Sequence, residues 1–183
     1  PALVYENYEG GSAKLDLCIE LIQSAVESGH KILLFSQFTS MIEILTARLQ
    51  EESISCFVLQ GSTKKEQRAQ MVEQFNRDDT SVFCISLKAG GTGLNLTGAD
   101  IVIHYDPWWN VAVENQATDR AHRIGQKNVV TVYKLIAKGT IEEKIIKLQQ
   151  MKKELAEEIL SGDEIKTASF QREELLELLE ERF

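Results

Sequence analysis

The sequence is short of cysteine and has no long hydrophobic run, and each shortage argues against a class of protein. Three cysteines occur in 183 residues, and their odd number and wide spacing argue against a disulfide framework or a zinc site. No apolar run reaches the roughly 18–20 residues of a membrane helix, so we expect no membrane contact. We expect the cysteines to be small core residues of an intracellular protein: Cys18, Cys56 and Cys84.

The motifs that bind nucleoside triphosphates and metals are missing as well. The sequence has no Gly-x-x-x-x-Gly-Lys-[Ser/Thr] segment, no Asp-Glu pair at the end of an expected strand, and no His/Cys/Asp cluster with metal-ligand spacing. A nucleoside triphosphatase made of this chain alone would lack the phosphate-binding Lys and the metal site. Because the chain starts at Pro1, with neither an initiator Met nor a signal segment, we expect a fragment of a longer protein.

Negative charge is concentrated at one end of the chain. The formal net charge is -8, but residues 154–183 hold 10 acidic and 3 basic residues, whereas residues 1–153 hold 18 acidic and 17 basic ones. The total argues against nucleic-acid binding, yet the nearly neutral body can carry a local basic face. We expect one domain over residues 1–160 and a separate acidic helical tail over residues 161–183.

Helical and extended patterns alternate along the body. Short apolar runs predict five strands, and apolar residues at helical spacing predict helices between and after them. This order predicts an α/β fold, in which a parallel sheet is flanked by helices on both faces and followed by a C-terminal helical extension. Three helix starts carry capping-box pairs: Ser40 with Glu43, Thr63 with Glu66, and Thr140 with Glu143. The expected strands are 31–36, 55–59, 81–87, 100–105 and 129–136, and the helices lie near 15–26, 40–49, 63–76, 111–122 and from 140 onward.

Polar and glycine-rich segments follow the expected strands, where open parallel sheets gather their function. Residues 61–64, Gly-Ser-Thr-Lys, suit a nucleic-acid phosphate, and an ordinary capping turn explains them equally well. Residues 90–93, Gly-Gly-Thr-Gly, would let backbone N–H groups approach phosphates, and a tight strand-to-helix turn is the alternative. Trp108 and Trp109 could stack on a base or cover a phosphate backbone, or pack under neighbouring loops.

Two arginines stand out in the helix expected over 111–122. Arg120 and Arg123 are three residues apart and would share a helix face with Gln116, while Asp119 could orient Arg123. Two guanidinium groups at one helix end suit a polyphosphate whose charge grows in a transition state, and a solvated, salt-bridged face is the alternative. We expect the histidines to be structural: His30, His104 and His122.

Taken in order, these segments resemble the second RecA-like lobe of the Swi/Snf-family ATPases, in the second helicase superfamily. The most specific stretch is 106–126, from Asp-Pro-Trp-Trp-Asn to Asp-Arg-Ala-His-Arg-Ile-Gly-Gln. Gln126 favours this family over the sister RNA helicases, which have Arg there, whereas Gln60 and Val111 depart from its usual Asp and Pro. The match spans residues 12–160. Residues 31–40 resemble motif IV of the family, and residues 59–68 resemble its Asp-Gly-Ser-Thr segment. Residues 86–100 resemble motif V, and residues 132–144 resemble the family's later Val-Tyr-Lys-Leu-Ile segment.

The resemblance implies roles for individual residues. Arg120 and Arg123 would be arginine fingers that reach ATP held by a missing first lobe. The helix from 140 onward would be a brace that returns toward that lobe. The interlobe cleft would also contain Gly93, Asn95, Gln116 and Asp119. The backbone of one DNA strand would be contacted by Gln37, Gly61, Ser62, Thr63, Lys64, Lys88, Ala89, Gly90 and Trp109.

The function implied by the resemblance is the second motor lobe of an ATP-dependent double-stranded-DNA translocase. ATP and Mg²⁺ would be bound only by the full two-lobed protein, and we expect the fragment alone to be a monomer without ATPase activity. Two alternatives stay open: a non-catalytic DNA-binding or scaffold lobe, and an RNA helicase lobe, which Gln126 and the Trp pair disfavour. Because no nuclear-type basic cluster is present, we expect a prokaryotic, cytoplasmic protein, with a nuclear one as the alternative.

Overall fold

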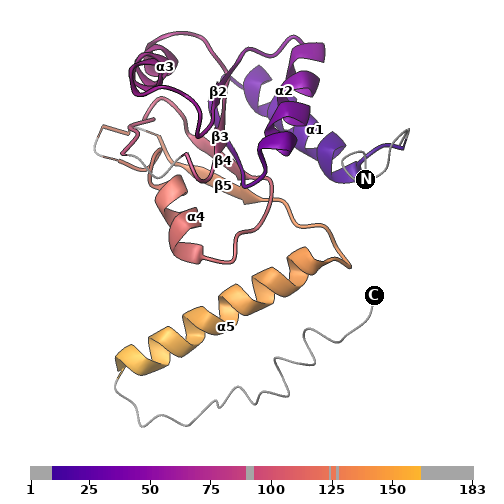
Figure 1. Ribbon diagram of the computed structural model, residues 1–183, viewed down its shortest axis with the longest axis vertical. Helices are drawn as coiled ribbons and strands as arrows, with labels where there is room; N and C mark the ends of the chain where they lie inside the picture. Colours follow the sequence, from indigo (N-terminus) through magenta and orange to yellow (C-terminus); the bar gives the residue numbers. More distant parts are fainter. Residues whose placement is uncertain (1–9, 90–92, 124, 127, 162–183) are drawn as a thin grey trace.

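The computed structural model describes residues 10–89, 93–123, 125–126 and 128–161, with side chains described up to residue 154 (Figure 1). The strands and helices lie where the sequence patterns predict them and differ only at their ends. The strands are β1 (Ile32–Ser36), β2 (Cys56–Leu59), β3 (Val82–Ser86), β4 (Ile101–His104) and β5 (Thr131–Lys134). The helices are α1 (Ala13–Glu27), α2 (Thr39–Glu51), α3 (Lys65–Arg77), α4 (Val111–Thr118) and α5 (Ile141–Ser161).

The strands form one parallel sheet in the order β2-β3-β1-β4-β5. The central strand β1 pairs with β3 on one side, where Leu34 faces Cys84, and with β4 on the other, where Leu34 faces Ile103. All residues of β1 and β3 are buried, which explains why both read as continuous apolar runs. The edge strand β5 is exposed at every position.

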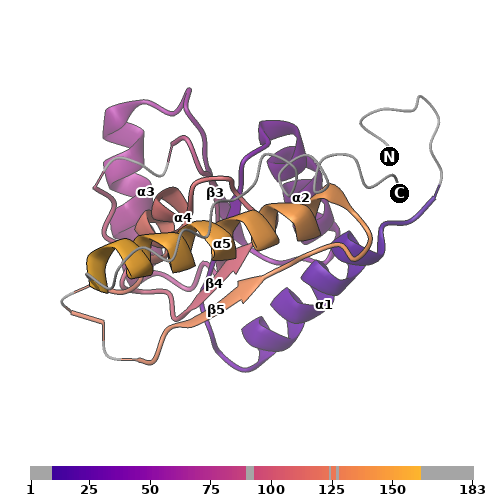
Figure 2. The ribbon, with the colours of Figure 1, turned by 90° about the horizontal axis from the view of Figure 1, so that it is seen from below.

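Helices cover both faces of the sheet, as predicted. Ile32 and Leu34 of β1 point into a core shared with α1 and α2, whereas Leu33 and Phe35 point into a second core that contains Phe75 of α3. Figure 1 shows α1 and α2 on one side of the strands and α3 and α4 on the other. The long helix α5 crosses below the sheet next to α4, as the turned view in Figure 2 shows.

Helix ends are where the predictions differ most from the structure. Two capping boxes are wrong: α2 begins at Thr39 after Phe38, and α3 begins at Lys65 after Lys64, and neither cap residue makes a side-chain bond to the helix. Thr140 does cap α5, since its Oγ1 accepts from the N–H of Glu142 at 3.2 Å. The predicted helix over 111–122 stops at Thr118, so the arginine segment lies beyond it.

Cys18 and Cys84 are fully buried core residues, as predicted, and Cys56 packs half-buried against the same cluster. Among the described residues, no helix is both long and apolar enough to cross a membrane. The predicted acidic tail lies outside the described residues, apart from Ser161 at the end of α5.

Candidate nucleic-acid and nucleotide surfaces

The sheet brings several predicted DNA-binding segments together at its carboxyl edge, the edge where the strands end. Because the strand order is β2-β3-β1-β4, the loops after these strands follow one another along that edge in the same order. They contain Gly61, Lys88, Gln37 and Trp109 respectively, which are all at least partly exposed. Segments that are far apart in the sequence therefore form one continuous row.

The loop after β2 is a hydrogen-bonded turn. The N–H of Thr63 donates to the carbonyl oxygen of Gln60 at 3.1 Å, and the N–H of Gln60 donates back to Thr63 Oγ1 at 3.1 Å. The Thr63 hydroxyl is thus engaged in holding the turn. Gly61, Ser62 and Lys64 are exposed around it and remain accessible to a ligand.

Arg68 on α3 ties the loop after β2 to the loop after β3, a role that sequence reasoning missed. Its Nε donates to the carbonyl oxygen of Thr63 at 2.9 Å, and its Nη2 donates to that of Gly61 at 3.2 Å. Its Nη1 reaches the carbonyl oxygen of Ala89 at 3.5 Å. Ala89 is buried and its N–H donates to Ser86, so it supports the loop from below, while Lys88 is exposed. Gly90, a predicted DNA contact, lies outside the described residues.

Asp106 joins the loop after β4 to the loop after β1. Its Oδ2 accepts from Ser36 Oγ at 2.5 Å and from the N–H of Gln37 at 2.9 Å. Burial raises the pKa of Asp106, and these two hydrogen bonds to the carboxylate act against that shift. Gln37 is held at its backbone, and its side chain lies close to Pro107, where Nε2 is 3.4 Å from the carbonyl oxygen.

The two tryptophans have different environments. Trp108 packs against the core beneath α4, whereas Trp109 is 45% exposed. The N–H of Trp108 donates to Glu114 Oε1 at 2.6 Å, and its carbonyl oxygen accepts from the side-chain amide of Gln149 on α5. Glu114 is buried and pairs with Lys134 of β5 at 2.5 Å. The backbone of Trp108 is therefore held at both its N–H and its carbonyl oxygen, and the exposed Trp109 follows directly after this anchored residue.

The arginines do not share a helix face, because α4 ends at Thr118 and both lie in the turn that follows. Arg120 is 3% exposed and Arg123 is exposed, so the expectation of two exposed fingers on one face is wrong. In the described part of the chain, no group bonds the buried Nε of Arg120. Burial lowers the pKa of Arg120, the neighbouring Arg123 adds to this shift, and Asp119 opposes it.

The remaining predicted cleft residues also lie on the α3–α4 side of the molecule. Gln116 and Asp119 are exposed, and Gly93 has a backbone φ of +48°, in the left-handed region that glycine adopts easily. The two buried or paired histidines are structural, as predicted. His104 Nε2 lies 3.0 Å from Thr118 Oγ1, and His30 Nδ1 lies 2.9 Å from Asp100 Oδ2. His122 is exposed.

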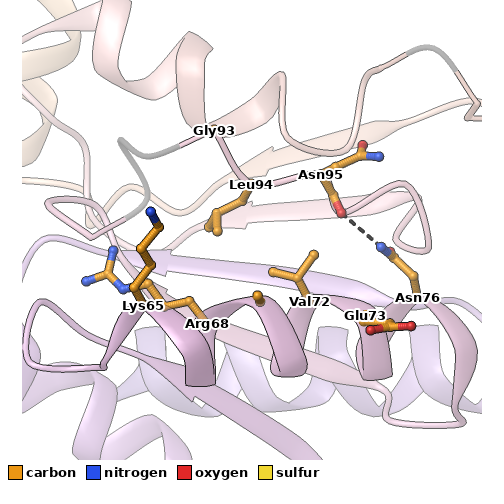
Figure 3. A pocket seen from close by; sticks show the side chains of 9 residues that line it. Lys65, Arg68, Val72, Glu73, Asn76, Gly93, Leu94 and Asn95 are labelled. Atoms are coloured by element: carbon orange, nitrogen blue, oxygen red, sulfur yellow. Dashed lines mark hydrogen bonds between the residues drawn. The ribbon is translucent and has the colours of Figure 1, made fainter.

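The connection between β3 and β4, residues 87–100, runs between α3 and α4 without a helix of its own in its described part; we call it the crossover. Asn76 of α3 binds it at two points, donating to the carbonyl oxygen of Asn95 at 2.9 Å and accepting from the N–H of Gly98 at 2.9 Å. Figure 3 shows these asparagines at one end of a hollow of about 450 Å³, with Arg68 at the other. A Cβ at Gly98 would lie 3.0 Å from Asn76 Oδ1, so a side chain there would disturb this contact.

Gln126 fastens the far end of the crossover to the segment 119–126, which we call the arginine turn. Its Nε2 lies 2.7 Å from the carbonyl oxygen of Ala99, 3.2 Å from that of Thr97 and 3.3 Å from that of Ala121. The backbone adds a further link, since the N–H of Leu96 donates to the carbonyl oxygen of Arg120 at 2.9 Å. The crossover is thus linked to the loop after β2 through Arg68 at one end and to the arginine turn at the other.

Comparisons with known proteins identify this arrangement. The family model described as "Helicase conserved C-terminal domain" matches residues 13–125. Over 170 residues the chain is 47% identical to an uncharacterized ATP-dependent helicase of Mycoplasma pneumoniae, covering 92% of this chain and 16% of that protein. Over 169 residues it is 43% identical to the chromatin-remodeling ATPase INO80 of Homo sapiens, covering 92% of this chain and 11% of that protein.

A solved structure agrees with these relatives. The crystal structure of the C-terminal part of the Fun30 ATPase domain matches with a TM-score of 0.73 and 38% identity, over 79% of this chain and 48% of that one. The chain belongs to the helicase C-terminal domain family. It is similar to the C-terminal helicase lobe of Swi/Snf-type ATPases. This helicase lobe has the RecA-like fold that the sequence resemblance implied. The lobe spans less than a fifth of the length of either curated relative.

Proposed function

We propose that this helicase lobe is the second motor lobe of an ATP-dependent double-stranded-DNA translocase. It would present arginines to ATP held by the first lobe of the parent protein and grip the DNA backbone with the loops at its carboxyl edge. The observation that carries the proposal is the crossover, whose ends are bonded by Arg68 on the DNA side and by Gln126 on the arginine side. A movement of the DNA-binding loops would therefore be transmitted through the crossover to the arginine turn, and the reverse.

The arginine turn supports the catalytic part of the proposal. Phosphoryl transfer needs positive charge beside the transferred group, and an arginine finger supplies it from outside the nucleotide's own pocket. Arg123 is exposed, whereas Arg120 is buried. We therefore assign direct contact with the phosphates to Arg123 first. Mg²⁺ would bind together with ATP at the first lobe.

The row of loops supports the DNA-binding part. Gly61 and Ser62 expose backbone and hydroxyl groups, Lys64 and Lys88 add ammonium groups, and Trp109 offers an aromatic face. These groups recognise the sugar–phosphate backbone rather than base edges. Affinity should consequently fall steeply with salt and depend little on DNA sequence. Thr63 and Ala89 would act by holding the loops, since their hydroxyl and backbone groups are already bonded.

The test is ATP hydrolysis by the two-lobed parent, with and without duplex DNA, for the wild type and Arg123→Ala. Arg77→Ala is a matched control, because Arg77 is an exposed arginine on α3 that pairs only with Glu73 among the described residues. We expect DNA-stimulated hydrolysis that falls by about 10³-fold in Arg123→Ala, with DNA affinity retained and Arg77→Ala active. Equal loss of hydrolysis and DNA binding would contradict the finger assignment. No hydrolysis by a wild type that binds DNA would favour the scaffold function.

A further inference from the structure

A groove of about 620 Å³ lies between the start of α4 and the face of α5, directly beside Trp109. Gln149 forms part of one wall, together with two lysines that follow it by three and four residues and so share its face of α5. The opposite wall carries the exposed ring of Trp109 and two asparagine side chains at α4. The polar and aromatic lining is Trp109, Asn110, Asn115, Gln149, Lys152 and Lys153.

The described side chains that line this groove carry only positive charge. Two ammonium groups line it, and none of the described lining residues is acidic. The nearby carboxylate of Glu114 is buried and already bonded to Lys134 and to the N–H of Trp108. Glu154 is bonded to Gln150 instead. Among the described residues, the walls therefore present no free carboxylate to a polyanion.

The groove also continues the proposed DNA surface. The row of loops at the carboxyl edge runs from Gly61 through Lys88 and Gln37 to Trp109, and the groove begins at Trp109. Its walls are firmly joined, because Gln149 donates both to the carbonyl oxygen of Trp108 and, at 3.1 Å, to Glu114 Oε1. A preformed, rigid groove loses less entropy when a strand binds than a pair of independent loops would.

We propose that this groove binds the backbone of duplex DNA, so that α5 is a part of the DNA-binding surface through Lys152. Trp109 would lie against the sugar–phosphate chain, and Lys152 would neutralise a phosphate beside it. The inference rests on the proposed function and extends it, because it adds an element outside the loops at the strand ends. It also makes α5 more than a brace toward the first lobe.

The experiment compares Lys152→Gln with Lys147→Gln in the two-lobed parent. Lys147 is a matched control: it is an exposed lysine of the same helix, about 140° around the axis from Lys152, and it does not line the groove. Dissociation constants for a duplex of fixed length are measured over a series of salt concentrations. The slope of log K against log salt reports how many phosphates the protein neutralises.

We expect Lys152→Gln to weaken binding several-fold at low salt and to reduce the slope by about 0.9. Lys147→Gln should leave the slope unchanged, and Lys152→Arg should restore it. Equal slopes for the two glutamine variants, with a wild type that binds duplex DNA, would overturn this inference alone; the groove would then be covered by the first lobe or by the acidic end of the chain. A wild type that does not bind duplex DNA would overturn the proposed function itself.

Discussion

The side-chain amide of Gln126 donates to the carbonyl oxygen of Ala99 at 2.7 Å, and this bond joins the arginine turn to the end of the crossover. The same residue accepts at Oε1 from the N–H of Asn128 at 2.9 Å, so both ends of the amide are used. Gln126 is a sequence marker of the family resemblance, and the structure shows that its side chain binds main-chain groups on both sides.

Gln126→Met should loosen the arginine turn while keeping the side-chain volume. The carbonyl oxygen of Ala99, a fully buried residue, would lose its side-chain donor, at a cost of about 1–3 kcal/mol in the free energy of unfolding. That of Ala121 would keep the N–H of Arg123 as its donor. Misplacing Arg123 should lower turnover of the two-lobed parent by about ten- to a hundredfold. Steady-state kinetics and urea unfolding measure the two effects, with Gln70→Met on the exposed face of α3 as control. Unchanged turnover in a destabilised protein would limit Gln126 to a structural role.

Arg68→Lys should weaken DNA binding although it keeps the charge. A lysine cannot donate at once to the carbonyl oxygens of Thr63, Gly61 and Ala89, so the two loops would lose their common anchor. We expect roughly tenfold weaker binding of duplex DNA with a nearly unchanged salt slope, because a net loss of about 1.4 kcal/mol corresponds to that factor. Arg77→Lys, made on the same helix, should bind like the wild type. A reduced slope in Arg68→Lys would instead mean that Arg68 itself contacts phosphate.

Glu114→Gln should destabilise the lobe and release the Trp108 loop from α4. The change removes the charge that pairs with Lys134 and turns one acceptor oxygen into a donor beside other donors. Because Lys134 stays partly exposed, we expect a loss of about 1–3 kcal/mol rather than the larger cost of a fully buried pair. Urea unfolding followed by tryptophan fluorescence measures it. Glu66→Gln, at an exposed position of α3, should change nothing, and an equal effect there would refute the assignment.

His104 should make the lobe less stable as the pH falls. Burial lowers its pKa from 6.5 to about 4, so the folded state resists protonation that the unfolded chain accepts. The free energy of unfolding should therefore decrease between pH 6.5 and 4, by up to about 3 kcal/mol. Asp106 opposes this trend in the acidic range, because its pKa is raised in the folded state. Urea titrations across this range should show a flatter pH profile for His104→Gln than for the wild type, and an equally flat profile for exposed His122→Gln would contradict the assignment.

Much of the fold could be predicted from the sequence because burial on both faces leaves a local signal. Residues 32–35 and 82–85 are continuous apolar runs, and their order with the helices led directly to the prediction of a parallel sheet. Helix ends were harder. Ser40 and Thr63 satisfy the capping pattern, but the helices begin elsewhere, and Thr63 uses its hydroxyl in a turn instead. Such competition between local hydrogen bonds leaves no trace in residue spacing.

The site could be predicted residue by residue only where a motif marked it. The motif singles out Arg120 and Arg123 as candidates, but their spacing placed them on a helix that ends before either of them. The anchoring roles of Arg68, Asn76 and Gln126 were missed, because all three bind backbone carbonyl or N–H groups of distant loops. Main-chain N–H and carbonyl groups are present at nearly every residue. The sequence therefore does not indicate which of them a given side chain binds.

Because the bonds to the crossover go to main-chain atoms, they determine which sequence changes the crossover tolerates. The side chains that bind the crossover donate to main-chain oxygens, so these hydrogen bonds do not depend on the residue types of the crossover. The acceptors are the carbonyl oxygens of Ala89, Asn95, Thr97 and Ala99. A segment of equal length with different exposed side chains can follow the same course, provided that the buried core positions stay apolar and glycine is kept where Asn76 contacts position 98. The buried positions are Leu87, Ala89, Leu94, Leu96 and Ala99. Substitutions confined to the exposed positions of the crossover would therefore leave its bonds to Arg68, Asn76 and Gln126 in place.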